Sequence, residues 1–343
     1  MSYQRNYVQN LINGFMSTMV LYTSCELGIF DALKKESQSV SKLAEALQIT
    51  EIELIRLLRP LEQYKLLQIK GNEWMLSELG EWLTTDQEGS LNAYTLFCGR
   101  ESLPAWSCMS PALKKQVSPG EVWNQSNIFS DMEQNGARFQ TFNGMMSSVS
   151  KQLDLTAFFE EFINKNETFT IADVGGGTGT IIKKFLNYYT NATGTILDLP
   201  QAKKDALRNL EKSNMTNRCS FMETDFFQAI QVHADVYVLS RVLHDWMDPQ
   251  AIQILQNVAR EMEDNSKLVI IEEVIREPDE PNAMRSYMND IQMWVFCDGK
   301  ERTLQECTDL FLQAGLKLDR LFDTEEGTAV LVAVKDNEEV GEI

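Results

Sequence analysis

Apolar residues near the start of the chain recur at steps of three and four positions. Val8, Leu11, Phe15 and Met19 follow this spacing, and polar residues fill many of the positions between them. A helix brings such positions onto one face, so the pattern predicts an amphipathic helix over residues 8–20. Its apolar stripe needs a covering surface, which either the same domain or a second subunit can supply.

The next segment has the pattern of a helix-turn-helix followed by a hairpin. Helical periodicity over residues 41–47 and 51–64 is interrupted by a short turn, and residues 66–76 alternate around Gly71-Asn72. DNA binding is one interpretation of this order. However, acidic and basic residues balance over residues 51–65, where a DNA-recognition helix needs an excess of basic side chains. A structural winged-helix-like unit is therefore the better interpretation.

The character of the chain changes near residue 163. Residues 91–162 are mostly helical in pattern, whereas short β-rich runs then alternate with helical stretches. This alternation predicts an α/β domain with a parallel sheet covered on both faces. We expect a first domain over residues 1–100, a helical connector over 101–162, a catalytic domain over 163–335 and a disordered acidic tail over 336–343. The predicted strands cover residues 169–174, 193–198, 219–223, 235–240, 267–272 and 328–334.

A glycine-rich loop, residues 173–179, follows the first of these strands and precedes a predicted helix. Glycines allow the backbone to turn sharply and to approach a ligand closely. The spacing is G-x-G-x-G, and Thr180 stands where a dinucleotide fingerprint has its last glycine, which disfavours a dehydrogenase. The loop also lacks the Lys-Ser/Thr pair of a P-loop, which disfavours phosphate transfer.

Acidic residues stand at the ends of the next two predicted strands. Asp198 ends the second strand, where a carboxylate can accept hydrogen bonds from both hydroxyls of a ribose. Asp225 follows the third strand, beside Phe226, at a position that can meet an adenine amino group. Because ligands in open α/β sheets gather at the carboxyl ends of the strands, we expect a nucleoside-containing cofactor at this edge.

The chain has two histidines, and their positions differ in kind. His233 lies among polar residues before a predicted strand, and we expect an exposed loop residue without a role. His244 follows the fourth predicted strand, at the ligand-binding edge. Glu272 ends the next strand and Glu301 lies in a loop entering a helix, so these acids can orient the imidazole and stabilise the imidazolium.

Charge and cysteine content limit the partners of the protein. The formal net charge is −19, which repels phosphate backbones, so we expect no nucleic-acid partner. The most apolar stretches have the length of strands, far below the roughly 20 residues of a membrane-spanning helix, so we expect no membrane partner. Six cysteines without a CxxC pair, together with two histidines, indicate no metal site. Reduced thiols and the absence of a signal-peptide pattern predict a cytoplasmic protein.

Several segments, taken in order, resemble the small-molecule O-methyltransferases typified by caffeic acid, hydroxyindole and phenazine O-methyltransferases. The resemblance covers nearly the whole chain. It implies a class I methyltransferase sheet, Rossmann-like with strand order 3-2-1-4-5-7-6. It also implies S-adenosyl-L-methionine as cofactor and a homodimer whose α-helical N-terminal domain caps the partner's active site. The matching segments are 26–33, 56–59, 142–146, 173–179, 198–200, 243–246, Glu272 with its strand, and 299–303.

The resemblance also implies roles for individual residues. His244 matches the general base of the family, and Glu272 and Glu301 match the two acids beside it. Ser240 departs from the lysine that is common in the plant enzymes, which puts that cofactor contact in doubt. The expected cofactor contacts are Asp173, Gly175, Gly177, Asp198, Leu199, Asp225, Phe226, Ser240 and Arg241. The expected substrate contacts are Phe142, Asn143, Met145, Met146, Trp246, Asn289, Asp290, Met293 and Trp294.

Together with the resemblance, these observations predict methyl transfer from S-adenosyl-L-methionine to a phenolic hydroxyl of a small aromatic acceptor from secondary metabolism. Three alternatives stay open. A repurposed member of the fold keeps the cofactor but performs decarboxylation, hydroxylation or pericyclisation, which the intact histidine and acids disfavour. A non-enzymatic winged-helix regulator is disfavoured by the charge of the chain. A dehydrogenase is disfavoured by Thr180.

Overall fold

The computed structural model describes residues 2–124, 136–324 and 327–337. The chain divides into two compact units. Unit 1 comprises Met1–Ser107 with Asn135–Val149, and unit 2 comprises Cys108–Gln134 with Ser150–Ile343. The domain boundaries expected at residues 100, 162 and 335 stay a prediction, and most of the acidic tail lies outside the described residues.

Unit 1 begins with two helices where the sequence predicted one. α1 (Ser2–Ile12) and α2 (Gly14–Glu26) are separated at Asn13. Side chains of the apolar stripe on α1 are open to solvent, with Leu11 64% and Ile12 67% exposed. The described chain therefore leaves this stripe without a cover.

A winged-helix-like unit follows, as the sequence predicted. Thr50 and Glu53 form a reciprocal capping box that starts its second helix, and Gly71 takes a left-handed φ of +63° in the hairpin turn. Leu43, Leu54 and Leu58 are fully buried in its core. Its elements are α3 (Ile29–Lys35), β1 (Gln38–Ser39), α4 (Val40–Leu47), α5 (Glu51–Gln63), β2 (Leu67–Lys70) and β3 (Glu73–Leu76), with sheet order β1-β3-β2. The remaining elements of unit 1 are η1 (Gly80–Leu83), α6 (Asn92–Phe97), η2 (Cys98–Ser102), α7 (Leu103–Trp106) and most of α11 (Gly136–Gln152).

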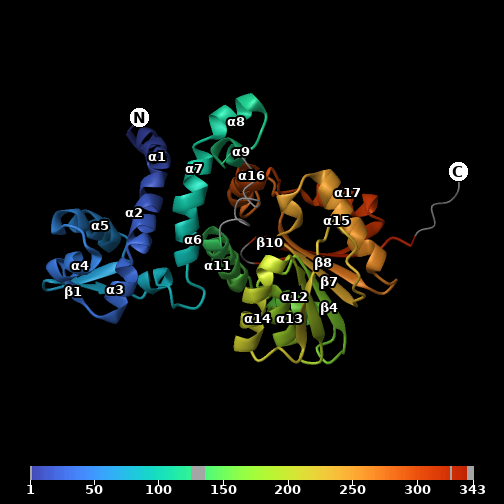
Figure 1. The fold of residues 1–343 in the computed structure, drawn as a ribbon. Helices are drawn as coiled ribbons and strands as arrows, with labels where there is room; N and C mark the ends of the chain where they lie inside the picture. The colour runs from blue at the N-terminus through green and yellow to red at the C-terminus, as the bar shows by residue number, and fades with distance from the viewer. Residues whose placement is uncertain (1, 125–135, 325–326, 338–343) are drawn as a thin grey trace. The chain divides into compact units, whose positions relative to one another are not determined.

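Unit 2 contains a seven-stranded sheet with the order β6-β5-β4-β7-β8-β10-β9 (Figure 1). β10 runs antiparallel to both of its neighbours, and the other pairs are parallel. Counted from β4, this order is 3-2-1-4-5-7-6, so the predicted methyltransferase sheet is confirmed. The strands are β4 (Thr170–Val174), β5 (Thr193–Asp198), β6 (Cys219–Glu223), β7 (Val236–Ser240), β8 (Lys267–Glu273), β9 (Leu316–Asp323) and β10 (Thr328–Lys335).

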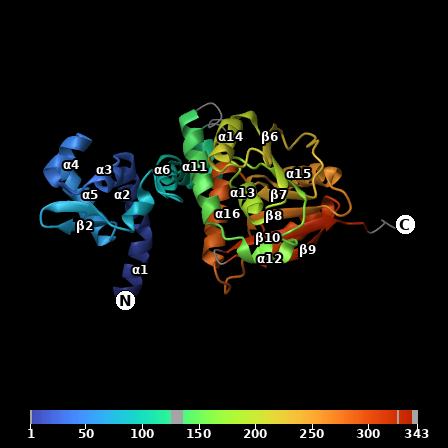
Figure 2. The ribbon, with the colours of Figure 1, turned by 90° about the horizontal axis from the view of Figure 1, so that it is seen from below.

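Helices cover both faces of this sheet (Figures 1 and 2). Residues of α15 and α17 pack with Leu239 and Leu331 on one face, and residues of α12, α13 and α14 pack with Val238 and Val330 on the other. No helix in the described parts of the chain is long and apolar enough to cross a membrane. The helices of unit 2 are α8 (Met109–Lys115), α9 (Pro119–Asn124), α12 (Thr156–Phe162), α13 (Thr180–Tyr188), η3 (Pro200–Ala202), α14 (Lys203–Lys212), η4 (Leu243–Asp245), α15 (Asp248–Glu261), α16 (Ala283–Cys297) and α17 (Leu304–Gln313).

Candidate functional site

The glycine-rich loop turns the chain from β4 into α13. Gly175, Gly177 and Gly179 all have left-handed φ angles, between +53° and +74°, which favour glycine. The N–H of Gly177 donates to Oδ2 of Asp198 at 2.7 Å. A Cβ atom on Gly177 would meet no atom within 4 Å, so open space lies directly beside the loop backbone. This is the space that a closely approaching ligand requires.

Carboxylates stand at the carboxyl ends of the strands around this loop. Burial raises the pKa of Asp173 to about 7, although the backbone amide of Ile182 acts to lower it. Asp198 accepts hydrogen bonds from the amides of Gly177 and Leu199, both at 2.7 Å, while burial raises its pKa. Asp225 is exposed, and its Oδ1 accepts a hydrogen bond from an amide two residues along at 2.9 Å.

Three buried polar atoms on the adjacent ends of β4 and β7 lack a hydrogen-bond partner in the described part of the chain. They are Oδ2 of Asp173, Oγ of Ser240 and Nη1 of Arg241. Arg241 also adopts a left-handed φ of +54°, which is uncommon outside glycine. Unpaired buried groups are costly, and all three lie at the carboxyl edge of the sheet, where a polar ligand can pair with them.

His244 lies in the short helix η4, directly after β7, and two glutamates hold one side of its ring. Nδ1 lies 3.0 Å from Oε1 of Glu301 and 3.2 Å from Oε2 of Glu272. Glu272 also fixes the turn, because its Oε1 accepts hydrogen bonds from the amides of Val242 and Leu243 at 3.0 and 2.9 Å. The three residues that the sequence grouped therefore do come together in space.

The carboxylate side of the His244 ring is closed. The cavity there measures about 10 Å³, close to the smallest space that holds a water molecule, and Ile270 and Phe311 are among its lining residues. Nε2 is the ring nitrogen on the other side, where Oδ1 of Asp245 lies at 3.7 Å. If Nδ1 keeps a proton between the glutamates, Nε2 is the nitrogen that can accept one.

The charges around His244 change its basicity. Burial acts to lower the pKa of the imidazole, but the negative charges of Glu272, Glu301 and Asp245 outweigh it and raise the pKa to about 10. Burial also raises the pKa of Asp245 to about 6, although His244 acts to lower it. His244 is thus a stronger base than an ordinary histidine.

The same three residues also have the composition of a possible cation site. One ligand atom from each of His244, Glu272 and Glu301 lies within 4.8 Å of the others. Because a proton on Nδ1 explains the hydrogen-bond distance to Glu301, the geometry does not require a metal. The expectation of no metal stays a prediction.

The expected substrate residues fall into two groups. The first group lies on α16 of unit 2. Oδ1 of Asp290 accepts a hydrogen bond from the amide of Glu301 at 3.0 Å, and the side chain of Asn289 forms a hydrogen bond with Glu273. Met293 and Trp294 are half-buried. Trp246 packs its ring edge-on against Phe226 and Phe227, which places it beside an expected cofactor residue. The other group lies on α11 of unit 1. Phe142 lies near Phe97, Met145 is buried, and Met146 is half-buried. Nδ2 of Asn143 is buried, and no described residue forms a hydrogen bond with it. A joint pocket stays a prediction.

Sequence reasoning missed two residues beside His244. Asp245 was quoted only as part of a motif, although its carboxylate faces Nε2. Arg302 was also quoted without a role, yet it is 3% exposed and hydrogen-bonded to the His244 turn. The available signal was the position of Arg302 directly after Glu301, between a loop and a helix.

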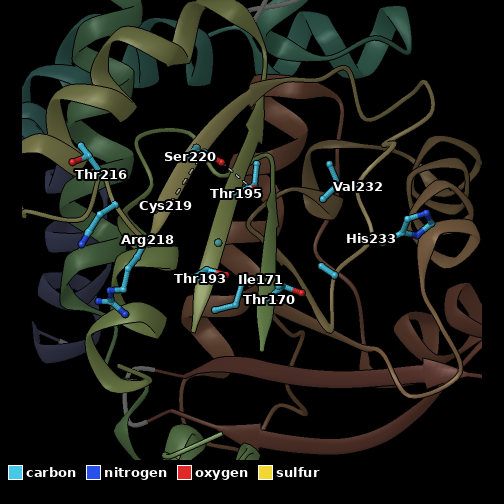
Figure 3. A pocket seen from close by; sticks show the side chains of 13 residues that line it. Thr170, Ile171, Thr193, Thr195, Thr216, Arg218, Cys219, Ser220, Val232 and His233 are labelled. Atoms are coloured by element: carbon cyan, nitrogen blue, oxygen red, sulfur yellow. Dashed lines mark hydrogen bonds between the residues drawn. The ribbon is translucent and has the colours of Figure 1, made fainter. Parts of the chain in front are cut away.

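A second cavity, of about 330 Å³, lies at the opposite, amino-terminal edge of the sheet (Figure 3). It is lined by the starts of β4, β5 and β6, and by the exposed His233. Arg218 in its wall already donates to the carbonyls of Leu186 and Thr190, at 3.0 and 2.9 Å. This cavity contains none of the expected site residues, and the prediction that His233 is an exposed loop residue is confirmed.

Comparison with known proteins identifies the family. Residues 114–317 match the O-methyltransferase domain, and residues 9–86 match the O-methyltransferase dimerisation domain. The phenazine O-methyltransferase of Lysobacter antibioticus is 26% identical over 324 residues, covering 94% of both chains. The phenazine-1-carboxylate N-methyltransferase of Pseudomonas aeruginosa is 26% identical over 338 residues, covering 96% of this chain and 97% of that one.

The fold agrees with a solved structure of similar size. Human N-acetylserotonin methyltransferase, in complex with S-adenosylmethionine, superposes with a TM-score of 0.83 at 24% identity, covering 97% of each chain. The domain match covers more than half of this chain, and the dimerisation match covers most of the part before it. The chain belongs to the O-methyltransferase family and is an S-adenosylmethionine-dependent methyltransferase of small molecules.

Proposed function

We propose that this protein transfers a methyl group to a hydroxyl of a small aromatic acceptor, most simply a phenol, with His244 as general base. The observation that carries the proposal is the pair of glutamates on Nδ1 of His244, which leaves Nε2 as the proton acceptor. Asp173, Asp198 and Arg241 support the cofactor side of the site, since Asp173 and Arg241 offer unpaired buried polar atoms for an amino acid and Asp198 offers acceptors for the hydroxyls of a ribose.

The reaction needs a base of suitable strength. When bound, S-adenosylmethionine supplies an electrophilic methyl group on its sulfonium. Nε2 of His244 accepts the proton of the acceptor hydroxyl, and the two glutamates stabilise the resulting imidazolium. A phenol has a pKa of about 10. The carboxylates around His244 raise its pKa towards that of a phenol, which lowers the cost of proton transfer. An ordinary histidine would leave it uphill by roughly 5 kcal/mol.

We also propose a homodimer that forms through the N-terminal helices. The match of residues 9–86 to a dimerisation domain and the exposed apolar stripe on α1 support this assembly. Obligate interfaces bury large and mostly apolar areas, which Tyr7, Leu11 and Ile12 can supply.

Methylation of nitrogen is the second candidate, because one of the relatives is named as an N-methyltransferase. The two candidates differ in their need for a base. A neutral aromatic ring nitrogen attacks through a lone pair and has no proton to lose, whereas a phenol gains nucleophilicity when its proton leaves. N-methylation of such a nitrogen therefore depends little on His244.

Methyl transfer from radiolabelled S-adenosylmethionine tests the proposal. The acceptor panel contains phenols, dihydroxynaphthoic acids, hydroxyindoles and aromatic nitrogen heterocycles, and mass spectrometry with NMR locates the new methyl group. We expect an O-methyl product whose formation is lost in His244→Ala. An N-methyl product formed at equal rates by wild type and His244→Ala would overturn the proposal.

A further inference from the structure

Arg302 is buried in unit 2 and lies next to Glu301 in sequence. We propose that Arg302 is a positioning residue for His244. Its side chain connects the turn that contains His244 to the loop that contains Glu301. This inference rests on the proposed role of His244 as the base. The hydrogen bonds that the structure gives the Arg302 guanidinium go to two backbone carbonyls and to Asp248. Arg302 acts on the backbone on both sides of His244.

The contacts of Arg302 bracket the histidine. Its Nη1 donates to the carbonyl of Leu243 at 3.0 Å, and its Nη2 donates to the carbonyl of Trp246 at 2.7 Å. Its Nε donates to Oδ1 of Asp248 at 3.0 Å. One acceptor therefore precedes His244 by one residue and another follows it by two. The guanidinium spans the whole turn.

The chemistry of the side chain suits this task. The last carbonyls of a short helix have no partner within the helix, and η4 is only one turn long. A guanidinium is planar and presents several N–H groups in a fixed fork, so it can bind two carbonyls and a carboxylate at once. A lysine ammonium is a point donor on a flexible stem and cannot hold the same geometry.

The loop that contains Glu301 is also held against the His244 turn by backbone contacts. The amide of Lys300 donates to the carbonyl of His244 at 2.9 Å. A Cβ atom on Gly299 would stand 2.0 Å from that same carbonyl oxygen, so only glycine allows the loop to come this close. The carbonyl of Arg302 accepts the amide of Ile275 at 2.9 Å, just beyond β8. Arg302 thus joins the His244 turn to the loop of Glu301 and, through its backbone, to the chain that follows Glu272.

Loss of this contact is expected to loosen the ring without removing any group that reacts. A displacement of about 1 Å at a reacting group can cost on the order of 10²-fold in rate. We therefore expect Arg302→Lys and Arg302→Gln to lower kcat by roughly 10- to 100-fold. The Kd for S-adenosylmethionine should stay within about 2-fold of wild type, because Arg302 contacts none of the expected cofactor residues and acts only on the catalytic turn.

NMR of the resting protein gives a readout that activity alone cannot. With two histidines in the chain, ¹⁵N-histidine labelling yields two imidazoles, and His233→Gln assigns the remaining one to His244. We expect the Nδ1 proton of His244 to resonate far downfield and to exchange slowly in wild type. Arg302→Lys and Arg302→Gln should exchange this proton at least about 10-fold faster. Asp248→Asn is the matched control, because it removes the half-exposed ionic partner and keeps both carbonyl contacts.

The outcomes separate this inference from the proposed function. Equal activity in wild type and His244→Ala would end the general-base proposal, while the exchange rate of the Nδ1 proton would still test whether Arg302 holds the ring. Folded Arg302 variants with wild-type exchange and wild-type kcat would overturn the positioning role. If Arg302→Gln does not fold, Arg302→Lys tests the positioning role, since lysine keeps the positive charge and loses only the planar arrangement of N–H donors.

Discussion

His244 and Glu301 are 57 residues apart in sequence, yet Nδ1 of the histidine lies 3.0 Å from Oε1 of the glutamate. Glu272 approaches the same nitrogen, so two negative charges act on one ring. Replacing His244 with alanine should lower methyl transfer by about 10²–10⁴-fold, the usual contribution of a positioned base. Calorimetry should show unchanged affinity for S-adenosylmethionine. Wild-type activity of His244→Ala towards a weakly acidic phenol would contradict the assignment.

The two glutamates should differ when each is changed to glutamine. Glu301→Gln removes a charge beside Nδ1 and is expected to lower kcat less than His244→Ala does. Glu272→Gln should also lower the melting temperature, because the hydrogen bonds from the amides of Val242 and Leu243 are stronger to a charged carboxylate than to a neutral amide oxygen. Thermal unfolding and steady-state kinetics on both variants check this difference. Equal losses of stability would show that these amide contacts contribute little.

The dependence of kcat/KM on pH should report the raised pKa of His244. A base must be unprotonated to act, so the rate should rise as the pH rises through the pKa, which is about 10 in the free protein. Glu301→Gln should move this limb to lower pH because one negative charge is lost. Initial rates measured from pH 6 to 10.5 test this. An acceptor that does not itself ionise in this pH range serves as the control. A plateau already reached at pH 7 would indicate an ordinary imidazole.

Asp198 should be needed for cofactor affinity. Asp198→Ala removes the carboxylate that accepts the amides of Gly177 and Leu199 and that we propose as the ribose contact, so affinity should fall by roughly 1–3 kcal/mol. Glu223→Gln is the matched control, because Glu223 pairs with Asp198 in strand register but is exposed beside Lys203. Isothermal titration with S-adenosylmethionine distinguishes them. Equal effects of both changes would argue against a specific role.

Asp173→Asn should stabilise the free protein at neutral pH. The folded pKa of Asp173 is raised to about 7, so its contribution to stability is fully present below its ordinary pKa near 4 and is lost as the pH rises to about 7. Asparagine avoids this loss, and the gain in unfolding free energy should grow from near zero at pH 4 to at most about 4 kcal/mol above pH 7. Urea unfolding at several pH values measures it. A gain that does not change with pH would contradict this account.

Charge placed on the exposed stripe of α1 should prevent dimer formation. Leu11→Glu together with Ile12→Glu puts two carboxylates where we expect an apolar interface. Light scattering should find a dimer for wild type and a monomer for the double variant. Gln9→Glu, at another exposed position of α1, controls for charge alone. A wild-type protein that is monomeric at micromolar concentration would refute the assembly.

Six of the seven strands, and the grouping of His244 with Glu272 and Glu301, could be predicted because their signals are local. The strand order was implied by the family resemblance. A glycine loop between a strand and a helix, and acids at strand ends, are visible in the sequence without distant partners. β9 was not predicted as a strand, because charged residues such as Lys317, Asp319 and Arg320 interrupt its apolar pattern. The break at Asn13 was hidden because the apolar spacing continues across it.

Electrostatics could not be predicted from the sequence. An ordinary histidine places the limb of the pH profile near pH 6–7, whereas the carboxyl groups of Glu272, Glu301 and Asp245 move the pKa of His244 to about 10. This shift depends on distances that only the packed fold defines. The burial of Arg302 likewise depends on contacts with a turn 56 to 59 residues away.

The chain leaves unit 1 after Ser107 and returns to it for α11. Within that unit, Arg138 pairs with Glu101, and the hydroxyl of Ser148 donates to the carbonyl of Ser90. Recombination between relatives at a single crossover near residue 107 would therefore separate residues that pair with each other within unit 1. In such a chimaera, α11 would come from one parent and the rest of unit 1 from the other, so α11 would pack against side chains that differ from its own partners. Exchange of unit 1 between relatives therefore requires two segments to be replaced together, the N-terminal part and α11. This makes independent recombination of unit 1 and unit 2 difficult.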